Sequence, residues 1–331
     1  VNHRVKLTME SEDLHALDKA YTRLALLLPK VRILISRDVM MSSSEVHNAP
    51  QSTDPRKEIG WLLTKVSPGG VSSLLPPSLC SKIGHTLSMF ERAYQEYEFQ
   101  EVCVAFNGGK DCTVMLDLLH SYLVHKGHDF SQQKLQVLYV VCSKPFPEVE
   151  TFVDESVSRY SLNLVKMEDK MQNALCQLKT SHPQFKAIMM GQRHTDPYCA
   201  KLSDFSPTDN SWPEYMRINC LLVCSLPLSL FPFLSFTTTS FTYAHTYILP
   251  LQDWSYMDVW MFLRIMSIEY CPLYDIGYTS LDGVEDTEEN PHLAVSTEMQ
   301  LLTGQPCVTG GYQPAYMLAN EEHERAGRST S

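Results

Sequence analysis

From Ser81 to Gly191 the chain alternates short, nearly continuous apolar runs with stretches that are apolar on one face at helical spacing. The alternation predicts helices over 81–97, 148–160 and 170–180, a further helix after residue 112, and strands over 101–106, 136–142, 162–166 and 187–191. Strands that are apolar throughout and separated by helices are typical of a parallel sheet covered on both faces. We therefore predict an α/β fold with a doubly wound parallel sheet, whose ligands bind at the carboxyl ends of the strands.

One predicted strand-to-helix turn has residue types that suit a phosphate group. Residues 104–113 read Val-Ala-Phe-Asn-Gly-Gly-Lys-Asp-Cys-Thr. Gly108 and Gly109 can let an anion approach backbone N–H groups, while the helix N-terminus and Lys110 add positive charge. The spacing matches neither a Walker A motif nor a G-x-G-x-x-G turn. Asp111 favours a ligand site over an ordinary turn with a solvated lysine, because an acid there needs a metal ion or a ligand donor.

Composition and charge restrict the partners of the chain. The 331 residues include 27 basic and 38 acidic side chains, a formal net charge of −11, which disfavours nonspecific binding to nucleic acid. An anionic substrate then needs a local basic cluster. The ten cysteines include no C-x-x-C pair, which predicts reduced thiols and neither a disulfide framework nor a zinc site. The start of the chain, Val1 to Lys6, lacks both an initial Met and an apolar signal segment. We expect a cytoplasmic fragment of a longer product.

Three segments differ in their pattern. Residues 1–30 hold a short alternating run and an amphipathic stretch, which are too small to bury a core alone. Residues 31–78 are rich in Ser, Pro and Gly, which predicts a linker. Residues 79–331 carry the regular alternation of strands and helices, and we expect them to form one catalytic domain.

Several motifs occur in an order that resembles one enzyme family. They are Phe-Asn-Gly-Gly-Lys-Asp-Cys at 106–112, Gly-Gln-Arg-His-Thr-Asp-Pro at 191–197, Ser-Pro-Thr-Asp at 206–209, Trp254, Leu-Tyr-Asp-Ile-Gly-Tyr-Thr-Ser at 273–280 and Glu-Arg-Ala-Gly-Arg at 324–328. Over residues 80–328 the chain resembles the eukaryotic FAD synthases. The resemblance implies a nucleotide-binding fold like that of phosphoadenylylsulfate (PAPS) reductase, transfer of AMP from ATP to FMN with release of pyrophosphate, and a need for Mg²⁺. It also implies that residues 1–30 are the remnant of a molybdopterin-binding-like domain.

The same resemblance assigns roles to particular residues. The ATP phosphates would be bound by Asn107, Gly108, Gly109, Lys110, Asp111 and Arg193. FMN would be bound by Asp196, Asp209, Asp253, Trp254, Arg325 and Arg328. Catalytic roles would fall to Lys110, Asp196, Asp209, Arg325 and Arg328, and Asp111 and Asp209 are candidate Mg²⁺ ligands. FMN and ATP are the expected partners, with no nucleic acid and no membrane, and the oligomeric state is left open.

Each assignment has a plainer alternative. Lys110 could be a surface lysine, and Asp111 could only complement the helix dipole. Asp196 precedes a proline, where aspartate is a common turn residue, and we expect His194 to be structural. Arg325 and Arg328 lie three residues apart, so on a helix they would share a face, and the alternative is a frayed helix with solvated charges.

Two segments depart from the family pattern. After Leu281, acidic side chains crowd residues 282–289, where the family has neutral or basic residues, so weaker nucleotide affinity is expected. Residues 220–249 contain no Asp, Glu, Lys or Arg, yet Pro227 and Pro232 would break a membrane helix. Joining Asn219 to Pro250 restores the family's continuous segment. We therefore expect 220–249 to be a retained intron or gene-model error.

The sequence leaves other functions to be excluded. A PAPS reductase needs a nucleophilic cysteine in its tail, which residues 311–331 do not contain. The acidic loop and the apolar insertion would favour a catalytically impaired nucleotide-binding homologue, which would bind ATP without forming FAD. A tRNA-thiolating enzyme with a similar loop is disfavoured by the net acidity and by the missing C-x-x-C pair.

Overall fold

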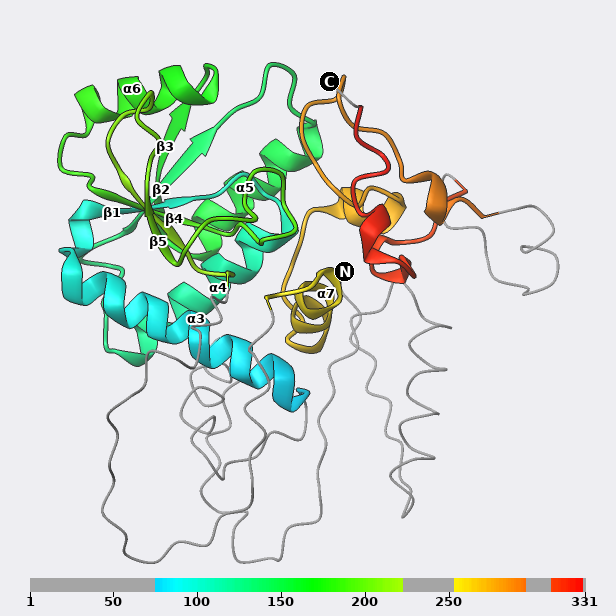
Figure 1. The fold of residues 1–331 in the computed structure, drawn as a ribbon, viewed down its shortest axis with the longest axis horizontal. Helices are drawn as coiled ribbons and strands as arrows, with labels where there is room; N and C mark the ends of the chain where they lie inside the picture. Colours follow the sequence, from blue (N-terminus) through cyan, green and yellow to red (C-terminus); the bar gives the residue numbers. More distant parts are fainter. Residues whose placement is uncertain (1–74, 223–252, 296–310, 330–331) are drawn as a thin grey trace, which may run out of the picture. The chain divides into compact units, whose positions relative to one another are not determined.

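The structure is a computed structural model that describes residues 75–222, 253–295 and 311–329, all within one compact unit (Figure 1). The elements predicted within residues 1–30, most of the linker and most of the apolar insertion lie outside these residues. The fold below is that of the described part of the chain.

A six-stranded, mostly parallel sheet forms the centre of the fold, in the order β3-β2-β1-β4-β6-β5. The strands are β1 (Val102–Ala105), β2 (Leu135–Val140), β3 (Leu162–Met167), β4 (Ala187–Met190), β5 (Phe205–Pro207) and β6 (Met216–Asn219). Only β5 runs antiparallel to its neighbour. The prediction of an α/β fold with parallel strands is confirmed, with one antiparallel strand added at the edge.

Helices cover both faces of the sheet (Figure 1). One apolar cluster joins Val102 and Val104 of β1 to α3 (Pro77–Glu96), α4 (Lys110–His125) and α5 (Pro147–Arg159). The opposite face, with Cys103 and Ile188, packs against α6 (Met171–Ser181). The strands are apolar throughout because alternate side chains enter two different cores.

The order of the strands places a switch point between β1 and β4. The chain passes from β1 through α4 to β2 and through α5 to β3, then crosses back through α6 to β4 on the other side of β1. The connections that leave β1 and β4 therefore diverge at the carboxyl edge of the sheet. In doubly wound folds this is where ligands bind.

The structure contains elements that the sequence pattern did not predict. β5 and β6 follow β4 in a region for which no strand was predicted. After the insertion come α7 (Tyr256–Ile265) and four short 3₁₀ turns, η4 (Pro272–Ile276), η5 (Pro291–Leu293), η6 (Ala315–Met317) and η7 (Glu321–His323). Ser255 caps α7, since its hydroxyl accepts from the N–H of Asp258 at 3.1 Å. Another 3₁₀ turn, η2 (Phe99–Glu101), precedes β1.

Two predicted boundaries shift by a few residues. α3 begins at Pro77, and Leu75 is already buried, so the end of the predicted linker belongs to the fold. Cys220, Leu221 and Leu222 are also buried, although they were assigned to the insertion. The N–H of Cys220 donates to the carbonyl of Met190 at 3.1 Å, which continues the pairing of β6 with β4.

We expect removal of the apolar insertion to raise both the soluble yield and the melting temperature, because it deletes a charge-free run from the middle of a regular fold. Two deletions, of 220–249 and of 223–252, each leave three residues between Asn219 and Asp253. The second keeps the buried residues 220–222 and should give the higher Tm by thermal denaturation. A lower soluble yield for both deletions would show that the insertion is a genuine packed element.

Within the described part of the chain, no helix is long and apolar enough to cross a membrane.

Candidate active site

The connections after β1 and β4 begin in close contact at the switch point, before they diverge. A Cβ atom on Gly191 would lie 2.9 Å from the backbone N and Cα of Cys112, so only glycine allows this approach. The first turn of α4 and the segment that begins at Gln192 therefore share one corner of the sheet.

The glycine loop is shaped by its own side chains. The side-chain oxygen of Asn107 accepts from the N–H of Gly109 at 3.1 Å, and the hydroxyl of Tyr274 accepts from the N–H of Lys110 at 3.0 Å. Gly108 has a φ of 75° and packs against α5, where a Cβ would lie 3.3 Å from a methyl of Val149. Two of the loop's N–H groups are thus engaged, so the loop offers fewer free amides than the sequence suggested.

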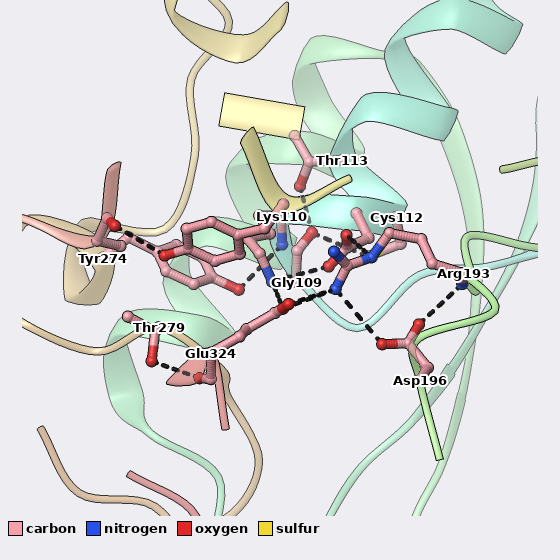
Figure 2. Close-up of polar contacts among 12 residues, drawn as sticks. Gly109, Lys110, Cys112, Thr113, Arg193, Asp196, Tyr274, Thr279 and Glu324 are labelled. Atoms are coloured by element: carbon pink, nitrogen blue, oxygen red, sulfur yellow. Dashed lines mark hydrogen bonds and ion pairs between the residues drawn. The ribbon is translucent and has the colours of Figure 1, made fainter. Parts of the chain in front are cut away.

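A buried cluster of charges lies beside this loop (Figure 2). Lys110 is 2 % exposed and Arg193 is 1 % exposed. The Lys110 ammonium lies 3.0 Å from an oxygen of Asp111 and 2.5 Å from an oxygen of Glu324. The plain alternative for Lys110, a solvated surface lysine, is therefore wrong.

Arg193 joins the same carboxylates from the β4 side. Its Nε lies 2.9 Å from Asp111, and its Nη2 lies 2.7 Å from both carboxylate oxygens of Glu324 and 3.4 Å from Asp196. The backbone N–H of Arg193 also donates to Asp196 at 2.8 Å. Two cations are thus held by three carboxylates, so the cluster has no surplus of positive charge.

The carboxylates keep the cluster ionised despite its burial. Burial alone would lower the pKa of Lys110, but Asp111 and Glu324 more than offset this and the pKa is raised. Burial raises the pKa of Asp111, but Lys110 and Arg193 outweigh it and the net pKa is lowered. For Asp196 burial dominates, and its pKa lies above the usual value although Arg193 opposes the shift. The geometry therefore presents a charged lysine and arginine at the sheet edge.

The C-terminal segment brings Glu324 into this cluster. The carbonyl of Glu324 accepts from the hydroxyl of Thr279 at 2.6 Å, and the amide of Asn290 donates to the carbonyl of His323 at 2.7 Å. The N–H of Glu288 donates to the carbonyl of Gly327 at 2.8 Å. Residues 279–290 thus hold three backbone carbonyls of the segment, those of His323, Glu324 and Gly327.

The tail arginines do not lie on a helix, contrary to our expectation. η7 ends at His323, and Thr287 forms an antiparallel bridge with Arg328. Arg328 forms an ion pair with Asp282 of the acidic loop, whereas Arg325 is exposed and forms no ion pair with any residue that the structure describes. The hydrogen bonds to residues 279–290 stop the tail from continuing as a helix.

Of the predicted FMN-binding residues Asp253 and Trp254, only Asp253 lies near the charge cluster. Asp253 is hydrogen-bonded to Nδ1 of His194, which follows Arg193 directly, and His194 Nε2 lies 3.1 Å from the carbonyl of Leu202. Asp253 is thus next to the β4 segment. Trp254, by contrast, is fully buried, with its indole N–H donating to Thr86 at 3.2 Å. It is a core residue with no exposed ring face for a flavin.

Asp209 lies at the opposite edge of the sheet. Pro207 of β5 pairs with Met216 of β6, and Met216 pairs with Ala187, the first residue of β4. The connection from β5 to β6 therefore runs along the amino edge of the parallel strands. Asp209 lies in this connection, with 73 % of its side chain exposed and Arg217 at 3.7 Å. The structure does not bring it to the charge cluster.

The sequence predicted Asp111 and Asp209 as Mg²⁺ ligands. No group of three or more His, Cys, Asp and Glu side chains among the described residues could hold a metal ion. Asp111, the candidate ligand at the loop, is already engaged by Lys110 and Arg193. A Mg²⁺ ion would therefore need ligands from outside this side-chain set.

Sequence reasoning missed the residues that complete the cluster. Glu324 lies 214 positions from Lys110, and although it opens the motif 324–328, only the arginines of that motif were assigned a role. Tyr274 and Thr279 lie inside a motif that was noted only for its resemblance. The capping hydroxyl of Tyr274 and the buried hydroxyl of Thr279 become visible only in three dimensions.

Comparisons with known proteins agree with this architecture. Residues 101–289 match the phosphoadenosine phosphosulfate reductase domain family. A probable FAD synthase of Schizosaccharomyces pombe is 34 % identical over 256 residues, which cover 76 % of this chain and 81 % of that protein. A probable FAD synthase of Caenorhabditis elegans is 29 % identical, and the match covers 75 % of this chain and 40 % of the longer nematode protein. The crystal structure of Candida glabrata FMN adenylyltransferase with FMN and the ATP analogue AMPCPP superposes with a TM-score of 0.63 at 25 % identity, covering 84 % of this chain and 97 % of that one.

Proposed function

Because the chain belongs to the phosphoadenosine phosphosulfate reductase domain family and to the FAD synthases, we propose that it transfers AMP from ATP to the phosphate of FMN, giving FAD and pyrophosphate. A phosphate oxygen of FMN attacks the α-phosphorus of ATP, and the bond from that phosphorus to pyrophosphate breaks. The reaction brings two polyanions together, so alignment and charge stabilisation are the main tasks of the protein.

The observation that carries this proposal is the convergence of Lys110 and Arg193 at the switch point of the sheet. Two cations from the connections after different strands, fixed in a buried site, stabilise a developing negative charge more than cations in water do. In this proposal Lys110 stabilises the departing pyrophosphate and Arg193 orients the triphosphate. Asn107, Gly108, Gly109 and Asp111 shape and orient the loop on which Lys110 stands.

The FMN side of the proposed site uses the residues that lie next to the cluster. Asp196 and Asp253 flank Arg193 and His194. Arg325 directly follows Glu324, and Arg328 lies four positions after it. Asp209 and Trp254 are not carried into the proposal, because one lies at the amino edge and the other is buried in the core.

Mg²⁺ belongs to the proposal only as the counterion of ATP. Mg²⁺ keeps several waters and is usually held by substrate phosphates with one or two carboxylates, so a dedicated cage of side chains is not required. Mg²⁺ alone should then give no binding signal in titration calorimetry, whereas ATP with Mg²⁺ should. The charge stabilisation that the chain itself supplies comes from its lysine and arginines.

The remaining assignments are also proposals. We place the enzyme in the cytoplasm, with residues 79–331 as the catalytic domain and residues 1–30 as part of a molybdopterin-binding-like domain. FMN and ATP are its only proposed partners.

One assay tests the activity. Purified chain is incubated with FMN, ATP and Mg²⁺, and FAD and pyrophosphate are measured separately. Both products should appear in equal amounts. Binding of ATP without either product would favour the catalytically impaired homologue. Sulfite release from PAPS would favour the reductase. The thiol of Cys112 does not suit that role, because burial raises its pKa to about 12 whereas reactive cysteines have a lowered pKa.

The acidic loop should reduce substrate affinity through one contact. Asp282 forms an ion pair with Arg328, so Asp282→Asn should free this arginine for phosphate and lower KM about two- to fivefold, as expected for a partly exposed pair. Glu285→Gln is the matched control, because the Glu285 carboxylate pairs with Lys144 and only its backbone carbonyl contacts the tail. Steady-state kinetics measure both variants. An equal change in KM for both would show that the overall loop charge matters and not the pair with Arg328.

A further inference from the structure

The carboxylate of Glu324 lies between the two buried cations of the site, as Figure 2 shows. One of its oxygens is 2.5 Å from the Lys110 ammonium, and both are 2.7 Å from Nη2 of Arg193. Among the acids that the structure describes, Glu324 is thus the one whose side chain joins the β1 connection to the β4 connection from outside both. It comes from a segment that lies beyond residues 101–289, the extent of the family match.

The contacts of Lys110 define the direction of its remaining N–H bond. An ammonium group has three N–H bonds, and here Asp111 and Glu324 each accept one. A lysine side chain is a flexible stem with a freely rotating head, so it presents a donor in a fixed direction only when other bonds hold it. The rings of Tyr256 and Tyr274, 5.2 and 5.9 Å from the ammonium, restrict the same head.

The backbone of Glu324 is fixed by buried polar groups. Thr279 is 1 % exposed and Asn290 is 0 % exposed, and they hold the carbonyls of Glu324 and His323. The amide of Asn290 also donates to the hydroxyl of Thr279 at 2.8 Å. If the segment left the site, these buried groups would lose their partners, which is costly. This disfavours an alternative in which the whole segment leaves the site when ATP binds.

We propose that Glu324 is a positioning residue for adenylyl transfer, which holds Lys110 and Arg193 so that their remaining N–H groups point at the substrate phosphates. This inference rests on the proposed function. Glu324 is not proposed to touch substrate. Its role is to supply the second carboxylate that fixes the lysine head and to hold the arginine at the same point.

The test compares four forms of the full chain: wild type, Glu324→Gln, Glu324→Asp and the control Glu322→Gln. Glu322 is exposed and lies in the same segment, so its substitution changes the tail charge equally. We expect Glu324→Gln to lower kcat about 10- to 100-fold, the scale for a small misplacement of a catalytic group. The KM for ATP should not rise, because the cluster loses a negative charge. Glu324→Asp keeps the charge but is shorter and should recover part of kcat, and Glu322→Gln should match wild type.

A second measurement does not depend on turnover. The ¹⁵N signal of the Lys110 ammonium is observed by NMR and assigned by its absence in Lys110→Met. A held ammonium exchanges its protons slowly and should give a signal in wild type and in Glu322→Gln, but not in Glu324→Gln. Wild-type kcat in Glu324→Gln, a lower KM at unchanged kcat, or a persistent lysine signal would each overturn the positioning role. If wild type forms no FAD but the signal is lost only in Glu324→Gln, the proposed function fails and the positioning contact stands.

Discussion

Replacing Lys110 by alanine should lower the rate of FAD formation at least about a hundredfold, the scale for removing one charge contact to a transition state. Lys110 is the cation that both the loop and the C-terminal segment hold in place, and its pKa is raised, so it is charged at neutral pH. Without it, Asp111 and Glu324 face each other across the site with Arg193 alone between them. The negative charge of the substrate phosphates is then repelled by carboxylates that Lys110 no longer neutralises. Steady-state kinetics with FMN and ATP measure the effect.

The control must separate lost chemistry from lost stability. Removing one partner of a buried ion pair costs about 3–5 kcal/mol of unfolding free energy, so Lys110→Ala should also lower the Tm. Lys82 is a matched residue, since it is buried and its ammonium lies 2.5 Å from Asp258. Lys82→Ala should lose comparable stability and keep its kcat per folded molecule. Near-normal turnover in Lys110→Ala would remove this lysine from the proposed mechanism.

The sheet and the position of the site could be predicted because both depend on local patterns. Apolar strands separated by amphipathic helices predict a parallel sheet, and β1 to β4 lie within a few residues of their expected positions. The carboxyl edge then follows from topology alone, and it brings Lys110 and Arg193 together although 83 positions separate them. Beyond β4 the prediction was weaker, because β5 and β6 have only three and four residues and lie among turn formers.

The roles of Glu324, Asp209 and Trp254 could not be read from the sequence, for different physical reasons. Glu324 acts through a contact across most of the chain, which no local pattern encodes. Asp209 was expected at the site from the family resemblance, but the antiparallel strand β5 carries the chain to the other edge of the sheet first. Trp254 suits either a core or a ligand, and only its full burial distinguishes the two.

The charge balance of the cluster makes the tail arginines essential to the proposal. Lys110 and Arg193 are offset by Asp111, Asp196 and Glu324, so these side chains alone leave no positive charge for the phosphates of ATP and FMN. The chain as a whole adds a net charge of −11. Mg²⁺ bound to ATP offsets part of the phosphate charge, and further cations must come from nearby residues. Arg325 and Arg328 lie one and four positions after Glu324 and are the cations that we propose to supply this charge.

Changing Arg325 and Arg328 together to alanine should lower FAD formation at least about a hundredfold while the sheet stays folded, because two charged donors to phosphate are lost. Arg325→Ala alone should be the more harmful single change, since Asp282 already neutralises part of the charge of Arg328. Lysine at either position should only partly substitute, because it cannot form the two parallel hydrogen bonds of an arginine with phosphate.

Lys126→Ala with Lys134→Ala is the control for this double change. Lys134 directly precedes β2, at the amino edge of the sheet, and Lys126 ends the preceding helix, so the pair removes the same charge far from the proposed site. If the effect were one of net charge, both double variants would weaken turnover alike. If the tail arginines bind the phosphates, only their loss should raise KM and lower kcat, with unchanged circular dichroism in both. A tail variant with normal kcat and KM would show that Arg325 and Arg328 are solvated charges, and the cations that balance the phosphates would have to be sought elsewhere in the chain.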